Sequence, residues 1–303
     1  MVKAENDRRP AAVTVGTFDG VHRGHRAVLA FLREEAARRG LDPLAVTFDR
    51  HPLMTVAPDR APKMITGADN RDLMIAGCGV GVRRVEFTGE IRRMTATGWM
   101  RELRDRYGAR LIVLGYDNRF GCDGATMTDD DLREAGRSLG IEVERGPEVE
   151  GCSSSAIRRA VEEGDMERAA DMLGRPFSLA GTVVSGRKLG RTIGIPTANL
   201  AVGPGMLLPR AGVYAASVMT PDGMRDAVVN VGLCPTVTDG DRVTVEAHLL
   251  DYSGDLYGRT IEIFFNSRLR DERKFGSLDE LTRQISLDIE EARRKNLRHH
   301  RRD

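Results

Sequence analysis

The order of strand-like and helix-like segments most restricts how this chain can fold. In residues 11–150, short apolar runs alternate with amphipathic runs, which predicts a parallel sheet covered by helices. We expect strands at residues 11–15, 44–48, 82–86 and 110–114. We expect helices at residues 25–39, 68–78, 97–107 and 129–139.

The pattern changes after residue 177. We expect short β-like segments at residues 178–184, 212–218, 225–231, 242–251 and 260–265, and their separation by Gly, Pro and Asp-Gly turns predicts a small antiparallel barrel. Ser277 and Glu280 form a capping-box signature, which predicts a C-terminal helix. A length of 303 residues agrees with about two domains. We therefore expect an α/β chain with domains at residues 1–177 and 178–303.

The string FDGVHRGH, residues 18–25, joins the first expected strand to the first expected helix. His22 and His25 are three residues apart and share one face of the first helical turn. A helix N-terminus attracts phosphate, and imidazoles can donate hydrogen bonds there. The alternative is that the histidines only pack against the helix or cap it. The candidate ligand-binding residues of this segment are Gly16, Phe18, Asp19 and Gly24.

Other polar strings follow the second and fourth expected strands. Ligands bind at the carboxyl ends of strands in such sheets, which makes Asp49, His51 and Asp117 candidates. Farther along, a helix is expected to begin at three serines, with an arginine one turn in, and this set suits a triphosphate. Its members are Ser153, Ser154, Ser155 and Arg158. The alternative is that a serine there is merely the helix cap.

Two stretches of the second half carry further candidates. Glycines and cations in residues 181–200 suit phosphate, namely Gly186, Arg187, Lys188, Gly190 and Arg191. Pro196 follows, and Thr197 and Asn199 point the same way in an extended segment, where their oxygens suit Mg²⁺. The alternative for this stretch is a surface loop. Glu246 shares the polar face of an alternating strand with Thr244 and His248, so it is either a general base or a solvated carboxylate.

Composition excludes several classes of protein. The net charge of +1 provides no general basic field for nucleic acid. The chain has no run of about 20 apolar residues that would span a membrane. The four cysteines form no CxxC pair, so neither a zinc knuckle nor a disulfide scaffold is expected. The polar first residues lack the apolar core of a signal peptide, so we expect a cytoplasmic protein.

The ordered motif set resembles the bacterial bifunctional riboflavin kinase/FAD synthetases. FDGVHRGH, VTFDRHP, GYDNRFG and CSSSAIR match the nucleotidyltransferase module of that family. GRTIGIPTAN, GVYA, NVGLCPT, VEAHLLDY, DLYG and LRDERKF match its riboflavin kinase module. The resemblance covers nearly the whole chain. It implies a Rossmann-like nucleotidyltransferase domain followed by a kinase barrel.

The resemblance implies two reactions with small-molecule substrates: ATP phosphorylates riboflavin to FMN, and a second ATP adenylylates FMN to FAD. His22 and His25 would contact ATP phosphates, with Ser154 and Arg158 assisting. Glu246 would be the base for the ribityl hydroxyl, and Thr197 and Asn199 would bind Mg²⁺. The implied flavin or nucleotide contacts of the barrel are Asn230 and the loop residues Arg270, Asp271, Glu272 and Phe275.

Departures from the family pattern include Arg50, Asn118 and Cys234. Arg50 and Asn118 leave open a second interpretation, in which the kinase site is intact and the adenylylation site is impaired. A third interpretation is a flavin- or nucleotide-binding regulator without turnover. The presence of a base together with metal ligands argues against a regulator, and oligomeric state is left open.

Overall fold

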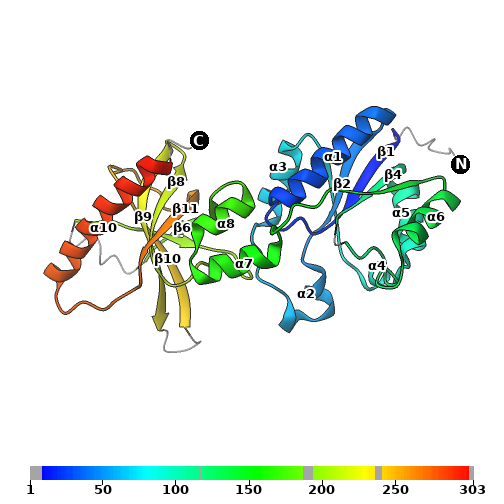
Figure 1. Ribbon diagram of the computed structural model, residues 1–303. Coiled ribbons are helices and arrows are strands. Elements are labelled where there is room, and N and C mark those ends of the chain that lie inside the picture. Colours follow the sequence, from blue (N-terminus) through cyan, green and yellow to red (C-terminus); the bar gives the residue numbers. More distant parts are fainter. Residues whose placement is uncertain (1–8, 117, 187–193, 236–240, 300–303) are drawn as a thin grey trace, which may run out of the picture. The chain divides into compact units, whose positions relative to one another are not determined.

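A computed structural model describes residues 9–116, 118–186, 194–235 and 241–299. The chain forms two compact units, residues 1–153 and 154–303 (Figure 1). Five of the predicted site residues lie outside the described residues: Asp117, Arg187, Lys188, Gly190 and Arg191.

The first unit contains a five-stranded, fully parallel sheet in the order β3-β2-β1-β4-β5. The strands are β1 (Ala11–Val15), β2 (Asp42–Phe48), β3 (Gly81–Val85), β4 (Ala109–Leu114) and β5 (Glu142–Arg145). All five residues of β1 are buried, as a central strand covered on both faces requires. The parallel sheet is confirmed. The edge strand β5 was missed, because its short sequence has only Val143 buried.

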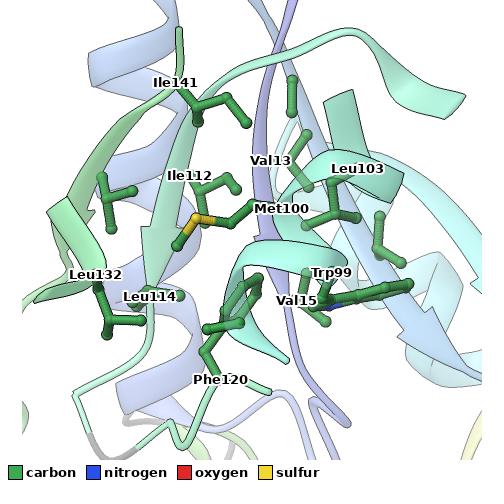
Figure 2. Packing of buried hydrophobic residues seen from close by; sticks show 14 of the residues in the cluster. Val13, Val15, Trp99, Met100, Leu103, Ile112, Leu114, Phe120, Leu132 and Ile141 are labelled. Atoms are coloured by element: carbon green, nitrogen blue, oxygen red, sulfur yellow. The ribbon is translucent and has the colours of Figure 1, made fainter. Parts of the chain in front are cut away.

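Helices cover both faces of this sheet. On one face, α1 (Arg23–Arg39) and α3 (Ala68–Gly77) bury Leu29, Leu32 and Ile75. On the other face, α5 (Ala96–Tyr107) and α6 (Asp129–Ser138) supply Trp99 and Leu132 (Figure 2). The sequence did not predict the short helices α2 (Pro52–Val56) and α4 (Gly89–Arg93). It also did not predict the three-residue 3₁₀ helix η1 (Pro58–Arg60).

The second unit contains a closed barrel with antiparallel neighbours, which confirms the predicted antiparallel barrel, and its strand order is β10-β7-β6-β11-β8-β9. Its strands are β6 (Phe177–Val184), β7 (Ala198–Ala201), β8 (Gly212–Thr220), β9 (Gly223–Pro235), β10 (Asp241–Leu249) and β11 (Thr260–Arg270). The C-terminal helix α10 (Leu278–His299) begins after Ser277, whose Oγ accepts a hydrogen bond from the Glu280 N–H. Ala292 of α10 packs on the barrel residues Val213, Ala215 and Val228.

Two helices, α7 (Ser154–Glu163) and α8 (Met166–Leu173), precede the barrel and belong to its unit. The Arg210 N–H donates to the Val161 carbonyl, and α8 packs on β6 and β11. The contacts of the chain therefore divide between Ser153 and Ser154, ahead of the change in sequence pattern near residue 177. The domain limits drawn from that pattern stay a prediction. Within the described ranges, no helix is long and apolar enough to cross a membrane.

Candidate functional sites

The two histidines of FDGVHRGH meet at the start of α1. His22 is the N-cap residue, and its Nδ1 accepts a hydrogen bond of 3.3 Å from the His25 N–H. The two rings stack with centroids 3.6 Å apart and an interplanar angle of 18°. Because Nδ1 of His22 is an acceptor, the proton of its neutral ring lies on Nε2. The structure thus shows that His22 caps α1.

His25 is uncharged at neutral pH. Burial, with the charge of the adjoining His22 as a smaller cause, lowers the pKa of His25 well below 6.5. Its Nδ1 is buried and has no hydrogen-bond partner among the described residues. The Phe18 and His25 rings are in a T-shaped arrangement, with centroids 5.3 Å apart and an interplanar angle of 69°. The pair can therefore offer neutral imidazole N–H groups to a phosphate without carrying two repelling charges.

The turn before α1 is strained and held from inside the protein. Phe18 and Val21 have φ angles of 47° and 39°, and residues other than glycine seldom adopt positive φ angles. Asp19 is 1% exposed, and its carboxylate accepts hydrogen bonds from the Ile65 and Thr66 N–H groups at 3.0–3.1 Å. Asp19, a predicted ligand contact, is thus placed where it fixes the turn to the loop before α3.

Arg71 holds the same turn, and sequence reasoning missed it. Its side chain, on α3, is 1% exposed. It donates to the Phe48 carbonyl at 2.8 Å and to the Thr17 carbonyl at 3.4 Å, which joins the carboxyl ends of β2 and β1. Burial lowers the pKa of Arg71. A signal existed, because Arg71 lies one turn before the buried Ile75 on the same helix face.

Two glycines leave space for the rings of His22 and Phe18. A side-chain carbon at Gly24 would lie 3.2 Å from the His22 ring, and one at Gly16 would lie 3.2 Å from the Phe18 ring. Both contacts are tighter than ordinary packing allows. The Cys152 Sγ also contacts the His22 ring, at 3.5 Å from Nδ1.

The remaining predicted residues of this site have local partners. Asp49 accepts from the Arg50 N–H at 2.8 Å, and His51 caps α2 by accepting from the Leu53 N–H at 3.2 Å. Asn118, one of the departures, donates to the Val15 carbonyl at 2.8 Å and so ties the loop after β4 to the end of β1. All lie near the carboxyl ends of β1, β2 and β4, the edge that the sequence predicted.

The serines of CSSSAIR lie at the start of α7. Ser153 is the last residue of the first unit, whereas Ser154, Ser155 and Arg158 belong to the second. Ser154 and Arg158 are half-buried and Ser155 is exposed. Their approach to the histidine pair stays a prediction.

Glu246 is at the centre of a polar row on the barrel. In the strand pairing it lies opposite Asn199 of β7 on one side and Asn230 of β9 on the other. Residues directly opposite each other point to the same face of a sheet. The Thr197 hydroxyl donates to Glu246 Oε2 at 3.5 Å. A side-chain carbon at Gly186 would lie 2.3 Å from Asn199 Nδ2, so this glycine leaves the space that the asparagine fills.

The loop after β11 reaches this row. Asn230 Nδ2 donates to Glu272 Oε1 at 3.3 Å, and a side-chain carbon at Gly232 would lie 2.3 Å from the same oxygen. Arg270 binds both carboxylate oxygens of Asp288 on α10 at 2.7–3.1 Å. The Arg270 and Arg273 guanidinium groups lie 5.8 and 4.6 Å from the Phe275 ring centroid. The structure thus brings Glu272 to the row and anchors Arg270 on the C-terminal helix.

The structure defines a class of protein: a two-unit chain with one polar cluster at the edge of a helix-covered parallel sheet and another on a closed antiparallel barrel. Two protein-family models match the chain. The FAD synthetase model matches residues 4–158, and the riboflavin kinase model matches residues 173–296. The chain belongs to the family of bifunctional riboflavin kinase/FMN adenylyltransferases.

Individual relatives agree with this assignment. The Pseudomonas fluorescens bifunctional riboflavin kinase/FMN adenylyltransferase is 38% identical over 295 residues, which cover 95% of this chain and 93% of the relative. The Escherichia coli K12 protein of the same description is also 38% identical, over 93% of this chain and 91% of its own. A crystal structure described as a macrolide-efflux protein from Streptococcus pneumoniae has a TM-score of 0.85 and 31% identity, and the match covers 94% of each chain.

Proposed function

We propose that the two polar sites divide the family's two reactions between them. The Glu246 row phosphorylates riboflavin to FMN, and the site of the stacked histidines adenylylates FMN to FAD with release of pyrophosphate. The observation that carries this proposal is that each family model covers a different polar site. The riboflavin kinase model covers the Glu246 row, and the FAD synthetase model covers the stacked histidines.

In the kinase reaction, Glu246 acts as the general base. Its carboxylate takes the proton of the ribityl 5′-hydroxyl as that oxygen forms a bond to the γ-phosphorus of ATP and the bond to ADP breaks. Asn199 and Asn230 lie opposite Glu246 on the flanking strands and form a polar row with it. Glu272 and Phe275, from the loop after β11, cover the flavin.

The chemistry of the residues fits a magnesium ion. The Thr197 hydroxyl and the Asn199 amide supply hard neutral oxygens next to the Glu246 carboxylate. In the described part of the chain, no group of three His, Cys, Asp or Glu side chains could hold a metal by itself. Mg²⁺ bound here would take its other ligands from water and ATP and would neutralise phosphate charge. The proposed phosphate contacts in this half of the chain are Gly186, Arg187, Lys188, Gly190, Arg191 and Pro196.

In the adenylylation reaction, a phosphate oxygen of FMN forms a bond to the α-phosphorus of ATP as the bond to pyrophosphate breaks. The helix start and the imidazole N–H groups of His22 and His25 stabilise charge on the phosphates, and no covalent enzyme intermediate is required. Ser153, Ser154, Ser155 and Arg158 bind the departing pyrophosphate. Gly16, Phe18 and Gly24 are the proposed contacts to ATP, and Asp49, His51 and Asp117 are the proposed contacts to the flavin.

The partners of the chain are small molecules in this proposal, with no nucleic acid. Because both reactions consume ATP, the cytoplasm is the proposed location.

One incubation tests the proposal. Purified protein is mixed with riboflavin, ATP and MgCl₂, and flavins are resolved by chromatography over time. We expect FMN to appear first and FAD to follow. FMN without FAD would support the interpretation with an impaired adenylylation site. Tight riboflavin binding without either product, at stoichiometric enzyme, would support the regulator.

A further inference from the structure

We propose that His248 is a positioning residue of the kinase site, which holds the Pro196–Thr197 peptide in place for phosphoryl transfer. The inference rests on the proposed roles of Thr197 and Glu246 and adds a residue to them. His248 lies on β10 two positions after Glu246, so both side chains leave the same face of the strand.

The geometry of His248 shows what it holds. Its Nδ1 lies 2.8 Å from the Pro196 carbonyl oxygen. A carbonyl oxygen only accepts hydrogen bonds, so Nδ1 carries the proton and donates. The β7–β10 ladder ends at the pair Ala198–Ala247, one position before His248. The side chain of His248 therefore continues the attachment of this segment to β10 beyond the last ladder pair.

The segment needs such an attachment. Pro196 is exposed and has no N–H to donate, and Thr197 precedes the first residue of β7. The Pro196 carbonyl and the Thr197 nitrogen belong to one planar peptide unit. Fixing the carbonyl oxygen fixes that plane, and with it the direction in which Thr197 leaves the backbone. The Thr197 hydroxyl lies at 3.5 Å from Glu246, the outer limit of a hydrogen bond, so a small rotation of the peptide separates them.

A purely structural role for His248 predicts a different outcome. Its strand pairs with β9 along its whole length, from Asp241 to Leu249, and His248 is only half-buried. Removal of the ring should therefore leave the barrel folded. If the ring positions Thr197, kinase kinetics and Mg²⁺-dependent nucleotide binding should change although stability does not.

The test compares four variants: His248→Ala, His248→Asn, Val243→Ala and Glu246→Gln. Asparagine places an N–H donor at nearly the same distance from the backbone as Nδ1. Val243 lies on the same strand, is 36% exposed, and serves as the matched control. We measure kcat and KM for riboflavin phosphorylation, FMN adenylylation in the same preparations, thermal unfolding, and ADP binding by calorimetry with and without MgCl₂.

For His248→Ala, we expect kinase kcat/KM to fall by roughly 10–100-fold, the usual cost of losing an outer partner of a metal ligand. The gain in ADP affinity on adding MgCl₂ should shrink as well. His248→Asn should recover most of both losses. Val243→Ala should match the wild type, and all His248 variants should keep FMN adenylylation and the wild-type melting temperature.

Two results would overturn the inference while leaving the proposed function standing. One is wild-type kinase kinetics in His248→Ala together with loss of kinase activity in Glu246→Gln. The other is a folded His248→Asn variant as impaired as His248→Ala, because a donor at that position would then not be what matters. Full kinase activity in Glu246→Gln would instead overturn the proposed base, and the role of His248 with it.

Discussion

The imidazole rings of His22 and His25 stack 3.6 Å apart at the start of α1, and the Nδ1 of His22 accepts the backbone N–H of His25. The contact links the two residues both through their rings and through the helix cap. Two cationic rings at this distance would repel each other. The stacking therefore explains why the pKa of His25 is lowered, in addition to the larger effect of its burial.

The lowered pKa of His25 predicts how stability depends on pH. Between its folded pKa and 6.5, His25 is neutral when folded but protonated when unfolded. The unfolded state then binds more protons, so its contribution lowers the free energy of unfolding as the pH falls below 6.5. We expect the loss between pH 8 and pH 5.5 in denaturant titrations to be smaller in His25→Asn than in the wild type. An equal loss in both proteins would contradict the lowered pKa.

Glu246→Gln should lower riboflavin phosphorylation by roughly 10²–10⁴-fold, which is the usual contribution of a general base. FMN adenylylation should persist, because the histidine pair belongs to the other unit. Glu262→Gln is a matched control, since Glu262 lies on β11 of the same barrel and accepts a hydrogen bond from Ser178. Steady-state assays of both reactions check the result. Equal loss of both activities in Glu246→Gln would contradict separate sites.

Arg71→Met should impair adenylylation although Arg71 is fully buried. The change leaves the Phe48 and Thr17 carbonyls without their guanidinium donor, at a cost of roughly 1–3 kcal/mol for an unsatisfied buried group. It also frees the turn that carries Phe18 and the histidines. Chemical unfolding and FMN adenylylation assays measure the two effects, while the kinase activity of the same sample reports on the barrel.

The control for Arg71→Met is Arg84→Met. Arg84 bridges Asp69 and Asp72 at 2.7–2.8 Å on the surface of the same unit, where such pairs contribute about 0–1 kcal/mol. If Arg84→Met reduced adenylylation as much as Arg71→Met, the specific role assigned to Arg71 would be wrong.

Gly24→Ala should lower FMN adenylylation and leave the kinase unchanged. Its new methyl group would lie 3.2 Å from the His22 ring, so the ring must move away from His25 or the helix start must shift. Gly77→Ala on α3 is the control, because nothing lies within 4 Å of the added carbon. The measured quantity is kcat for FAD formation. Wild-type turnover in Gly24→Ala would show that the precise position of His22 does not matter.

Much of the fold was open to prediction because its signals are local. β1 is a short, mostly apolar run, α1 is an amphipathic run with helical period, and the glycine-histidine turn between them has its own recognisable string. The barrel was predicted from the spacing of its turns, but β7 was missed. That strand has four residues and is defined by its pairing with β6 and β10.

The sequence by itself determined the two architectures, the family, and most candidate site residues, because periodicity, turn residues and ordered motifs are properties of neighbouring positions. Only the tertiary structure decided that Asp19 faces a backbone loop, that Arg71 joins two strand ends, and that Asn199 and Asn230 flank Glu246. These relationships depend on strand register and on which loops meet at the edge of a sheet. Asp19 contacts Ile65 and His248 contacts Pro196, and the two residues of each pair are 46 and 52 positions apart. Such contacts produce no periodic pattern in the sequence.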